Sequence, residues 1–150
     1  MRVCVFIGAV LFLTTFFTAN ISYSFENEPD GYSGYEWGTD LDTYLKSGKK
    51  DLKMKNKIYY VAKINDVEVD IGYEFFEDKL YGVLINFPPE ERDKIVEHFT
   101  SLYGNPTMRK GDELYWIGKV TKIVIKQKDA EVVSIELEKK YFEEVSKNKK

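Results

Sequence analysis

The chain has 150 residues, a formal net charge of −3 and one cysteine. This length suits one domain of ordinary size. A mildly acidic chain is a poor candidate for nucleic-acid binding, which requires a basic surface, so we expect no nucleic-acid partner.

The N-terminus has the features of a secretory signal peptide. Arg2 gives a positive start, and residues 3–17 form an almost wholly apolar run that is too short to span a bilayer comfortably. Ser22-Tyr23-Ser24 supplies the small-x-small pattern of a cleavage site. We therefore expect residues 1–24 to be removed, which gives a periplasmic or secreted protein without a stable membrane anchor. The alternative is an uncleaved N-terminal anchor.

Cys4 bears on two modifications. It lies at the start of the apolar run, whereas a lipoprotein needs its cysteine at the end of that run, where cleavage exposes it for acylation. Cys4 would leave with the signal peptide, so the remaining chain has no cysteine from which to form a disulfide.

The domain begins after an irregular segment. Residues 25–34 are rich in Gly, Ser, Asn, Asp and Pro, which favours turns and predicts a flexible N-terminal arm. A single α+β domain is expected over residues 35–144. Its first helix is predicted from Asp40 to about Lys46, with Thr39 as the N-cap.

Three stretches of alternating apolar residues follow, and such alternation is typical of strands with one buried face. The three sets are Ile58, Tyr60, Ala62 and Ile64, then Val67, Val69, Ile71, Tyr73 and Phe75, then Tyr81, Val83, Ile85 and Phe87.

The two connections predict the register of these strands. A two-residue Asn-Asp turn would place Ile64 opposite Val67. A three-residue loop at 77–79 would place Phe75 opposite Tyr81. Both turns put the apolar sets on the same face, and a slip of one residue would turn a strand over.

A second helix is predicted from Glu90 to Tyr103, ended by Gly104. Its apolar stripe consists of Ile95, Phe99, Leu102 and Tyr103.

The plan of one helix followed by three strands then recurs. The second set of strands carries Leu114 and Trp116, then Thr121, Ile123 and Ile125, then Val133, Ile135 and Leu137. A three-residue loop at 128–130 would pair Ile123 with Ile135 and place Lys122 opposite Glu136.

The predicted fold class is α+β, with two helix-plus-three-stranded-meander units forming one antiparallel sheet of six strands and two helices on one face. The residues from Glu138 onward are expected to form a frayed tail, with a basic tail over 145–150.

The two faces of the sheet would carry different residues. The covered face would carry Tyr60, Val69, Ile71, Val83, Ile85, Trp116, Ile123 and Ile135. The uncovered face would carry Tyr59, Val61, Leu80, Leu84, Tyr115, Ile117 and Val124 among Glu68, Asp70, Lys122 and Glu136, with Gly72 and Gly82 lowering it locally.

Two elements resemble a group of small uncharacterised exported bacterial proteins. Gly34-Tyr35-Glu36-Trp37-Gly38-Thr39 resembles their G-x-x-W-G-T opening, and Leu102-Tyr103-Gly104-Asn105-Pro106 is similar to their L-Y-G-x-P element. The resemblance covers about residues 34–144 and implies no activity. By topology alone, the plan is similar to the β-lactamase-inhibitor-protein and outer-membrane-assembly small-lipoprotein scaffolds, which implies a non-catalytic binding module.

The residues that could carry chemistry favour no enzyme. His98 is the one histidine, and no serine lies in a nucleophile-elbow context. Asp40 and Asp42 lack the glycine and distal glutamate of a calcium loop, so helix capping explains them. We expect no catalytic residue, no metal site and no cofactor. The remaining charged or distinctive residues are interpreted as structural: Glu68, Asp70 and Glu74 as a solvated sheet face, the lysines between 46 and 57 as a solvated loop, and Trp37 as a cover for the end of the core.

The uncovered sheet face carries the functional hypothesis. An open face with many apolar groups is typical of a contact surface, so we expect a binding module directed at an unknown protein partner. The predicted contact residues are Tyr59, Val61, Leu84, Tyr115 and Ile117. The alternative is a carrier that takes an apolar small molecule between the sheet and the helices.

Overall fold

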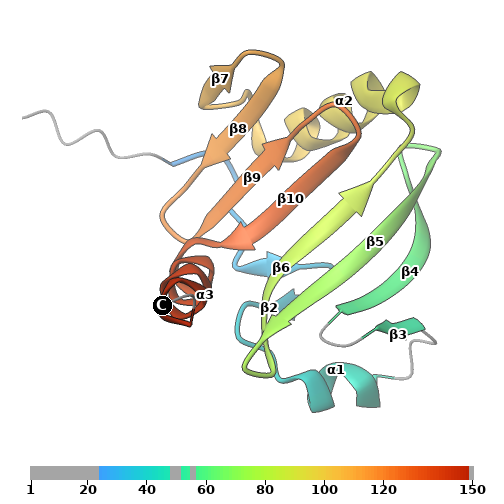
Figure 1. Ribbon diagram of the computed structural model, residues 1–150. Coiled ribbons are helices and arrows are strands. Elements are labelled where there is room, and N and C mark those ends of the chain that lie inside the picture. The colour runs from blue at the N-terminus through green and yellow to red at the C-terminus, as the bar shows by residue number, and fades with distance from the viewer. Residues whose placement is uncertain (1–23, 48–51, 55–56, 149–150) are drawn as a thin grey trace, which may run out of the picture.

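The computed structural model describes residues 24–47, 52–54 and 57–148 (Figure 1). The predicted signal peptide falls almost wholly on residues 1–23, which lie outside the described residues, as do the last two residues of the predicted basic tail. Within the described ranges, no helix is both long enough and apolar enough to cross a membrane.

The fold is α+β with an antiparallel sheet, as predicted. In chain order, the elements are β1 (Gly31–Tyr32), β2 (Tyr35–Glu36), α1 (Leu41–Lys46), β3 (Leu52–Met54), β4 (Lys57–Ile64), β5 (Val67–Phe76), β6 (Lys79–Asn86), a 3₁₀ turn (Pro89–Glu91), α2 (Arg92–Tyr103), β7 (Met108–Lys110), β8 (Glu113–Ile117), β9 (Thr121–Ile125), β10 (Asp129–Ser134) and α3 (Ile135–Lys147).

The main sheet of the described chain has eight strands in the order β3-β4-β5-β6-β10-β9-β8-β7, with every neighbouring pair antiparallel. The prediction of six strands was wrong, because β3 and β7 extend the sheet at its two edges. β6 and β10 lie side by side at the centre, so the last strand of each meander pairs with the other (Figure 1).

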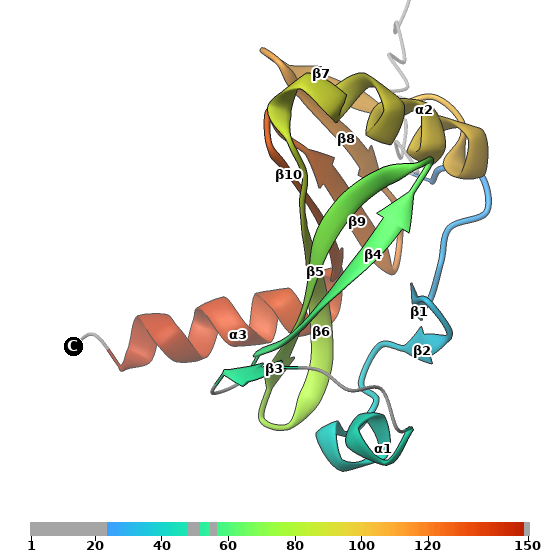
Figure 2. The same cartoon turned by 90° about the vertical axis from the view of Figure 1, so that its right-hand side faces the viewer.

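The two sides of the sheet are covered differently. Helices α1 and α2 and the small β1–β2 hairpin lie on one side, whereas α3 leaves from the other side (Figure 2). The core lies under α1 and α2, where Tyr44, Ile95, Phe99 and Trp116 are each at most 2% exposed. We call the opposite side of the sheet the open face.

The pairing of β4 with β5 is confirmed. Ile64 lies opposite Val67, and Tyr60 opposite Ile71. Asn65 and Asp66 have φ values of 48° and 64°, the left-handed conformation that a tight two-residue hairpin turn requires and that Asn and Asp tolerate.

The pairing of β5 with β6 departs from the prediction near the turn. Tyr73 lies opposite Val83 as expected, but Phe75 lies opposite Leu80 because the register shifts between Glu74 and Phe75. The irregularity exchanges the faces on which Leu80 and Tyr81 lie. Leu80, predicted on the open face, is fully buried in the core, and Tyr81, predicted in the core set, points to the open face.

The last predicted strand is partly a helix. Strand β10 ends at Ser134, whose Oγ accepts a hydrogen bond from the Leu137 N–H, 3.3 Å away, and α3 begins at Ile135. Ile123 therefore lies opposite Val132, not Ile135. The predictions of a core position for Ile135, a cross-strand Lys122–Glu136 pair and a frayed tail from residue 138 were wrong.

The segment predicted as a flexible arm packs against the domain. Phe25 is 7% exposed, and its ring contacts that of Tyr103. The Glu28 carboxylate accepts hydrogen bonds from the N–H groups of Val120 and Thr121, 2.6 and 2.8 Å away, in space that Gly118 leaves by having no side chain.

Trp37 covers the end of the core, as predicted, because it packs against the core cluster and its Nε1 donates to the Thr121 Oγ1, 2.7 Å away.

Two details of the helices differ from the sequence analysis. Asp40, not Thr39, occupies the N-cap of α1. Leu102, placed in the buried stripe of α2, is 42% exposed.

Candidate functional site

The open face carries a continuous line of side chains that crosses six strands. Successive pairings connect Tyr59, Gly72, Leu84, Glu131, Val124 and Tyr115. We call this line the cross-strand row. It contains three of the five predicted contact residues, so the register arguments placed them on one face.

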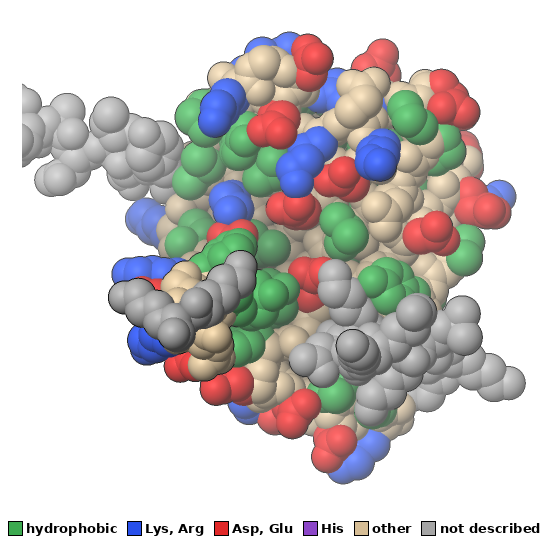
Figure 3. Space-filling view, viewed as in Figure 1, with side chains coloured by type: hydrophobic (Ala, Val, Ile, Leu, Met, Phe, Trp, Pro, Cys, Tyr) green, Lys and Arg blue, Asp and Glu red, His purple; other side chains and the backbone are tan. Residues whose placement is uncertain are grey.

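The other two predicted contact residues lie in the flanking rows. Val61 lies opposite Asp70 and is 63% exposed, and Ile117 lies opposite Lys122. Tyr59, Leu84, Tyr115 and Ile117 are partly exposed. All five therefore reach solvent on the open face, where apolar side chains lie among charged ones (Figure 3).

These residues do not form one compact cluster. Tyr59 on β4 and Tyr115 on β8 are separated by five strand spacings, or roughly 24 Å along the cross-strand row. Between them, Val124 is on the predicted face but only 4% exposed. A partner that contacted both tyrosines would have to extend across most of the sheet.

The two glycines of the open face do not leave hollows. A Cβ atom on Gly72 would lie 2.7 Å from Cε1 of Tyr59, and one on Gly82 would lie 2.9 Å from Cγ1 of Val133. Neighbouring side chains therefore fill both positions. The expectation that these glycines lower the surface was wrong.

Helix α3 is the feature of the open face that the sequence analysis missed. It projects away from the sheet, and only its first turns touch β6 and β10 (Figure 2). Its base is fixed by an ion pair between Lys122 and Glu138, 2.6 Å apart, and by the ring of Tyr141, which stacks on Tyr81 at 5.2 Å. Phe142 on the next position is 58% exposed.

The angle between α3 and the sheet encloses a notch of about 430 Å³. Leu84, Val133, Tyr81 and the two α3 aromatics provide its apolar surface. Figure 3 shows apolar side chains gathered where α3 leaves the sheet. Its lining is completed by Val83 and three carboxylates: Glu74, Glu131 and Glu138.

The polar groups of the notch are tied to the scaffold. The Tyr81 hydroxyl donates to Glu74 Oε2, 2.8 Å away. Burial raises the pKa of Tyr81, and the Glu74 charge raises it further, so Tyr81 is a neutral donor at physiological pH. Lys126 pairs with Glu131 and Lys122 with Glu138. The notch therefore keeps a fixed shape with acidic groups at its rim.

The other residues that were weighed as catalytic or metal-binding groups lie far apart. Asp40 pairs with Lys79 at the N-terminus of α1, Glu74 binds Tyr81 on the open face, and His98 lies on α2 on the far side of the sheet. The described residues contain no group of three or more His, Cys, Asp or Glu side chains that could hold a metal ion.

Comparison with known proteins gave no match: no family model, no curated protein and no solved structure is significantly similar to this chain.

Proposed function

We propose that this protein is an exported, non-catalytic module that binds another protein in the notch between α3 and the open face. The observation that carries the proposal is the position of α3. The helix stands away from the sheet and leaves Phe142 58% exposed beside an apolar floor. Exposed apolar surface of this kind, with a polar rim, is typical of protein contact sites.

The notch favours a partner segment that carries an apolar side chain. Leu84 and Val133 offer apolar contact, and the described residues that line the notch include three carboxylates and no Lys or Arg. Two of these carboxylates are paired with lysines outside the lining, Glu138 with Lys122 and Glu131 with Lys126, so apolar contact and not charge selects the partner.

The predicted contact residues extend the surface on both sides of the notch. Tyr59 and Tyr115 present large rings that are already held in place, Tyr59 over Gly72 and Tyr115 by a hydrogen bond to Glu113. Held aromatic rings lose little freedom on binding and are frequent anchors of interfaces. Val61 and Ile117 add apolar area next to them.

Export is proposed from the sequence of residues 1–24. Phe25, which follows the predicted cleavage site directly, is buried in the core and would remain in the processed chain.

The carrier alternative receives less support. A carrier needs a cavity between the sheet and the helices, lined by the core set. Tyr73, Ile85 and Trp116 are fully buried in the core cluster at that position, so a ligand there would have to displace packed side chains.

A capture experiment with matched variants tests the proposal. The tagged protein, Phe142→Ala and Leu45→Ala would each be incubated with periplasmic extract, and captured proteins quantified by mass spectrometry. Leu45 is the control, because it is an exposed apolar residue of similar accessibility, 41%, on α1 across the sheet.

The proposal predicts at least one protein that the wild type and Leu45→Ala capture equally and that Phe142→Ala captures about tenfold less, the loss expected for a central anchor. A set of captured proteins that is the same for all three forms, or no specific capture, would contradict the proposal.

A further inference from the structure

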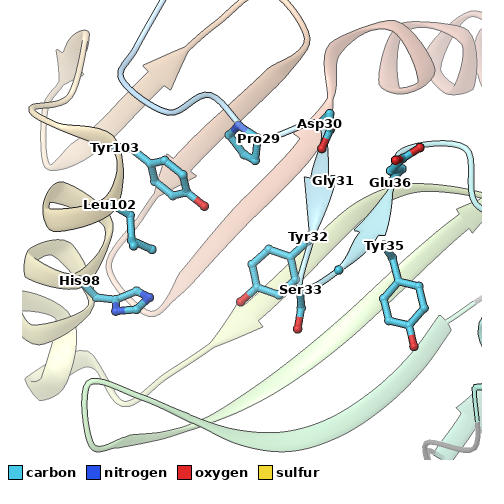
Figure 4. Close-up of a pocket in the computed structure, with 11 residues that line it drawn as sticks. Pro29, Asp30, Gly31, Tyr32, Ser33, Tyr35, Glu36, His98, Leu102 and Tyr103 are labelled. Atoms are coloured by element: carbon cyan, nitrogen blue, oxygen red, sulfur yellow. The ribbon is translucent and has the colours of Figure 1, made fainter.

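A second concave site lies on the side of the sheet opposite the notch. It is a cleft of about 530 Å³ between the β1–β2 hairpin and α2 (Figure 4). Volumes of this size are typical of small-molecule sites. Tyr32 points from the hairpin toward α2. His98, Leu102 and Tyr103 point from α2 toward the hairpin, so side chains from two separate parts of the chain converge on one space (Figure 4).

Both walls of the cleft are held by the scaffold. The hairpin closes through a two-residue turn at residues 33–34, whose φ values of 51° and 86° are the left-handed conformation that such a turn requires. The Tyr32 ring packs edge-on against Tyr73, at 6.2 Å. The Tyr103 ring packs edge-on against Phe25, at 5.7 Å. The cleft is therefore largely formed before any ligand enters, which lowers the cost of binding.

Three polar side chains of the cleft find no hydrogen-bond partner within the described residues. These are Tyr32, His98 and Tyr103, and each of them is partly buried. A polar group that has lost part of its hydration without gaining a partner gains from a ligand that hydrogen-bonds to it.

All three groups are neutral near pH 7. Burial raises the pKa of Tyr32, and the phenols of Tyr60 and Tyr103 raise it further. Burial also raises the pKa of Tyr103 and lowers the pKa of His98. A neutral phenol or imidazole can both donate and accept a hydrogen bond. A hydroxyl group of a ligand has the same two capacities, so hydroxyl groups match all three side chains.

The carboxylates of the hairpin do not select an ion. Glu36 lies opposite Gly31, one position along from the pair that contains Tyr32. Because successive side chains of a strand alternate between faces, the Glu36 carboxylate projects from the face opposite Tyr32 and away from α2 (Figure 4). Asp30 is exposed, so solvent screens its charge. No Lys or Arg is among the described residues that line the cleft, so a neutral ligand is favoured.

The cleft also offers apolar contact. Leu102 is 42% exposed on the α2 wall, one turn after His98 and next to Tyr103. A sugar ring has C–H groups on its faces and hydroxyl groups around its edge. It can therefore pack against a leucine side chain and aromatic rings while its hydroxyl groups hydrogen-bond to neighbouring polar groups.

We propose that the cleft between the β1–β2 hairpin and α2 binds a small neutral sugar. The hydroxyls of Tyr32 and Tyr103 and the ring of His98 hydrogen-bond to its hydroxyl groups. Its C–H face packs against Leu102. The site is on the other side of the sheet from the notch, so this proposal and the proposed function stand or fall independently.

Glucose, galactose and N-acetylglucosamine are the probes, and phenol represents the rival class of neutral ligand, a flat aromatic compound. Each would be titrated at pH 7 into the isotope-labelled protein while its backbone amide signals are recorded by NMR. The variants Tyr32→Phe and Tyr103→Phe remove a hydroxyl and keep the packed ring. The control is Ser101→Ala, which removes a hydroxyl from the same helix outside the cleft.

The proposal predicts that at least one of the three sugars shifts the signals of His98, Leu102 and Tyr103, with half-saturation below about 20 mM. Each phenylalanine variant should bind that sugar about two- to tenfold more weakly, as for one lost neutral hydrogen bond, and Ser101→Ala should bind it like the wild type.

Three results would overturn the proposal. The first is half-saturation above about 20 mM for all three sugars. The second is phenol binding more tightly than every sugar. The third is wild-type affinity for the sugar in both phenylalanine variants.

Discussion

The ring of Tyr59 on β4 lies over Gly72 on β5, so close that a Cβ atom on Gly72 would come within 2.7 Å of Cε1 of Tyr59. Glycine inside a strand weakens the sheet, and an aromatic ring from the neighbouring strand can cover the position. The pair therefore stabilises the sheet and fixes one anchor of the open face.

Replacing Gly72 with alanine should separate this pair. The new methyl group would push the Tyr59 ring off the sheet. Because the ring is the outer end of a partly exposed side chain and can turn aside, the expected loss of unfolding free energy is about 1 kcal/mol or less. Urea titration measures it. Tyr59→Phe is the control, because it keeps the ring and should have close to wild-type stability. A Gly72→Ala protein as stable as wild type would show that the ring is not held there.

The first meander shows how far a sequence pattern can predict register. A two-residue Asn-Asp turn allows one pairing of β4 with β5, and that pairing was predicted correctly. Glu77 and Asp78 form the same kind of turn, with φ values of 48° and 60°. Glutamate rarely adopts positive φ, so the sequence favoured a longer loop, and the irregularity after Glu74 that restores the register depends on packing.

The position of α3 was missed because two periodicities overlap. Val133, Ile135 and Leu137 alternate as in a strand, and the helical spacing of Leu137, Tyr141 and Val145 begins within the same stretch. Ser134, followed by Glu136 and Glu138, was the available signal for the start of a helix. The candidate contact residues on β4, β6 and β8 were predictable from register, whereas the notch was not, because it requires α3.

The core under α2 gives a direct test of helix orientation. Phe99 is 2% exposed and its ring contacts Tyr103 and Trp116, so Phe99→Ala should lower the free energy of unfolding by about 3 to 5 kcal/mol. His98→Ala, at a partly exposed neighbouring position, should cost much less. Denaturant titration compares them, and equal losses would mean that α2 docks through a different face.

Glu28 should make stability depend on pH. Burial acts to raise the pKa of its carboxyl, but hydrogen bonds from the backbone N–H groups of Thr121, Val120 and Lys119 and the Lys119 charge outweigh burial, so the pKa lies below its ordinary value of 4.5. Because the folded pKa is the lower one, the stabilisation is present above pH 4.5 and is lost as the pH falls through the folded pKa.

Glu28→Gln should therefore be less stable than wild type by about 1 kcal/mol at neutral pH, as for the loss of a backbone cap, and the difference should shrink at about pH 3. Urea titration at the two pH values measures this. A difference that stays constant or grows on acidification would contradict the assigned role of the carboxylate.

Export predicts a defined N-terminus. Signal-peptide cleavage after Ser24 would give a chain that begins at Phe25, and intact-mass spectrometry of the protein from the expressing cell measures this. A mass that includes residues 3–17 would refute cleavage and favour the N-terminal anchor.

Side-chain footprinting of the protein with its captured partner tests the central claim most directly. Hydroxyl radicals modify exposed aromatic and aliphatic side chains, so protection can be assigned to one face of the sheet, which backbone exchange cannot do. Binding at the notch and the open face predicts lower modification of Phe142, Tyr59 and Tyr115 in the complex, with Leu102 and Leu45 unchanged. Protection of Leu102 or Leu45 with no change at Phe142 would contradict the account.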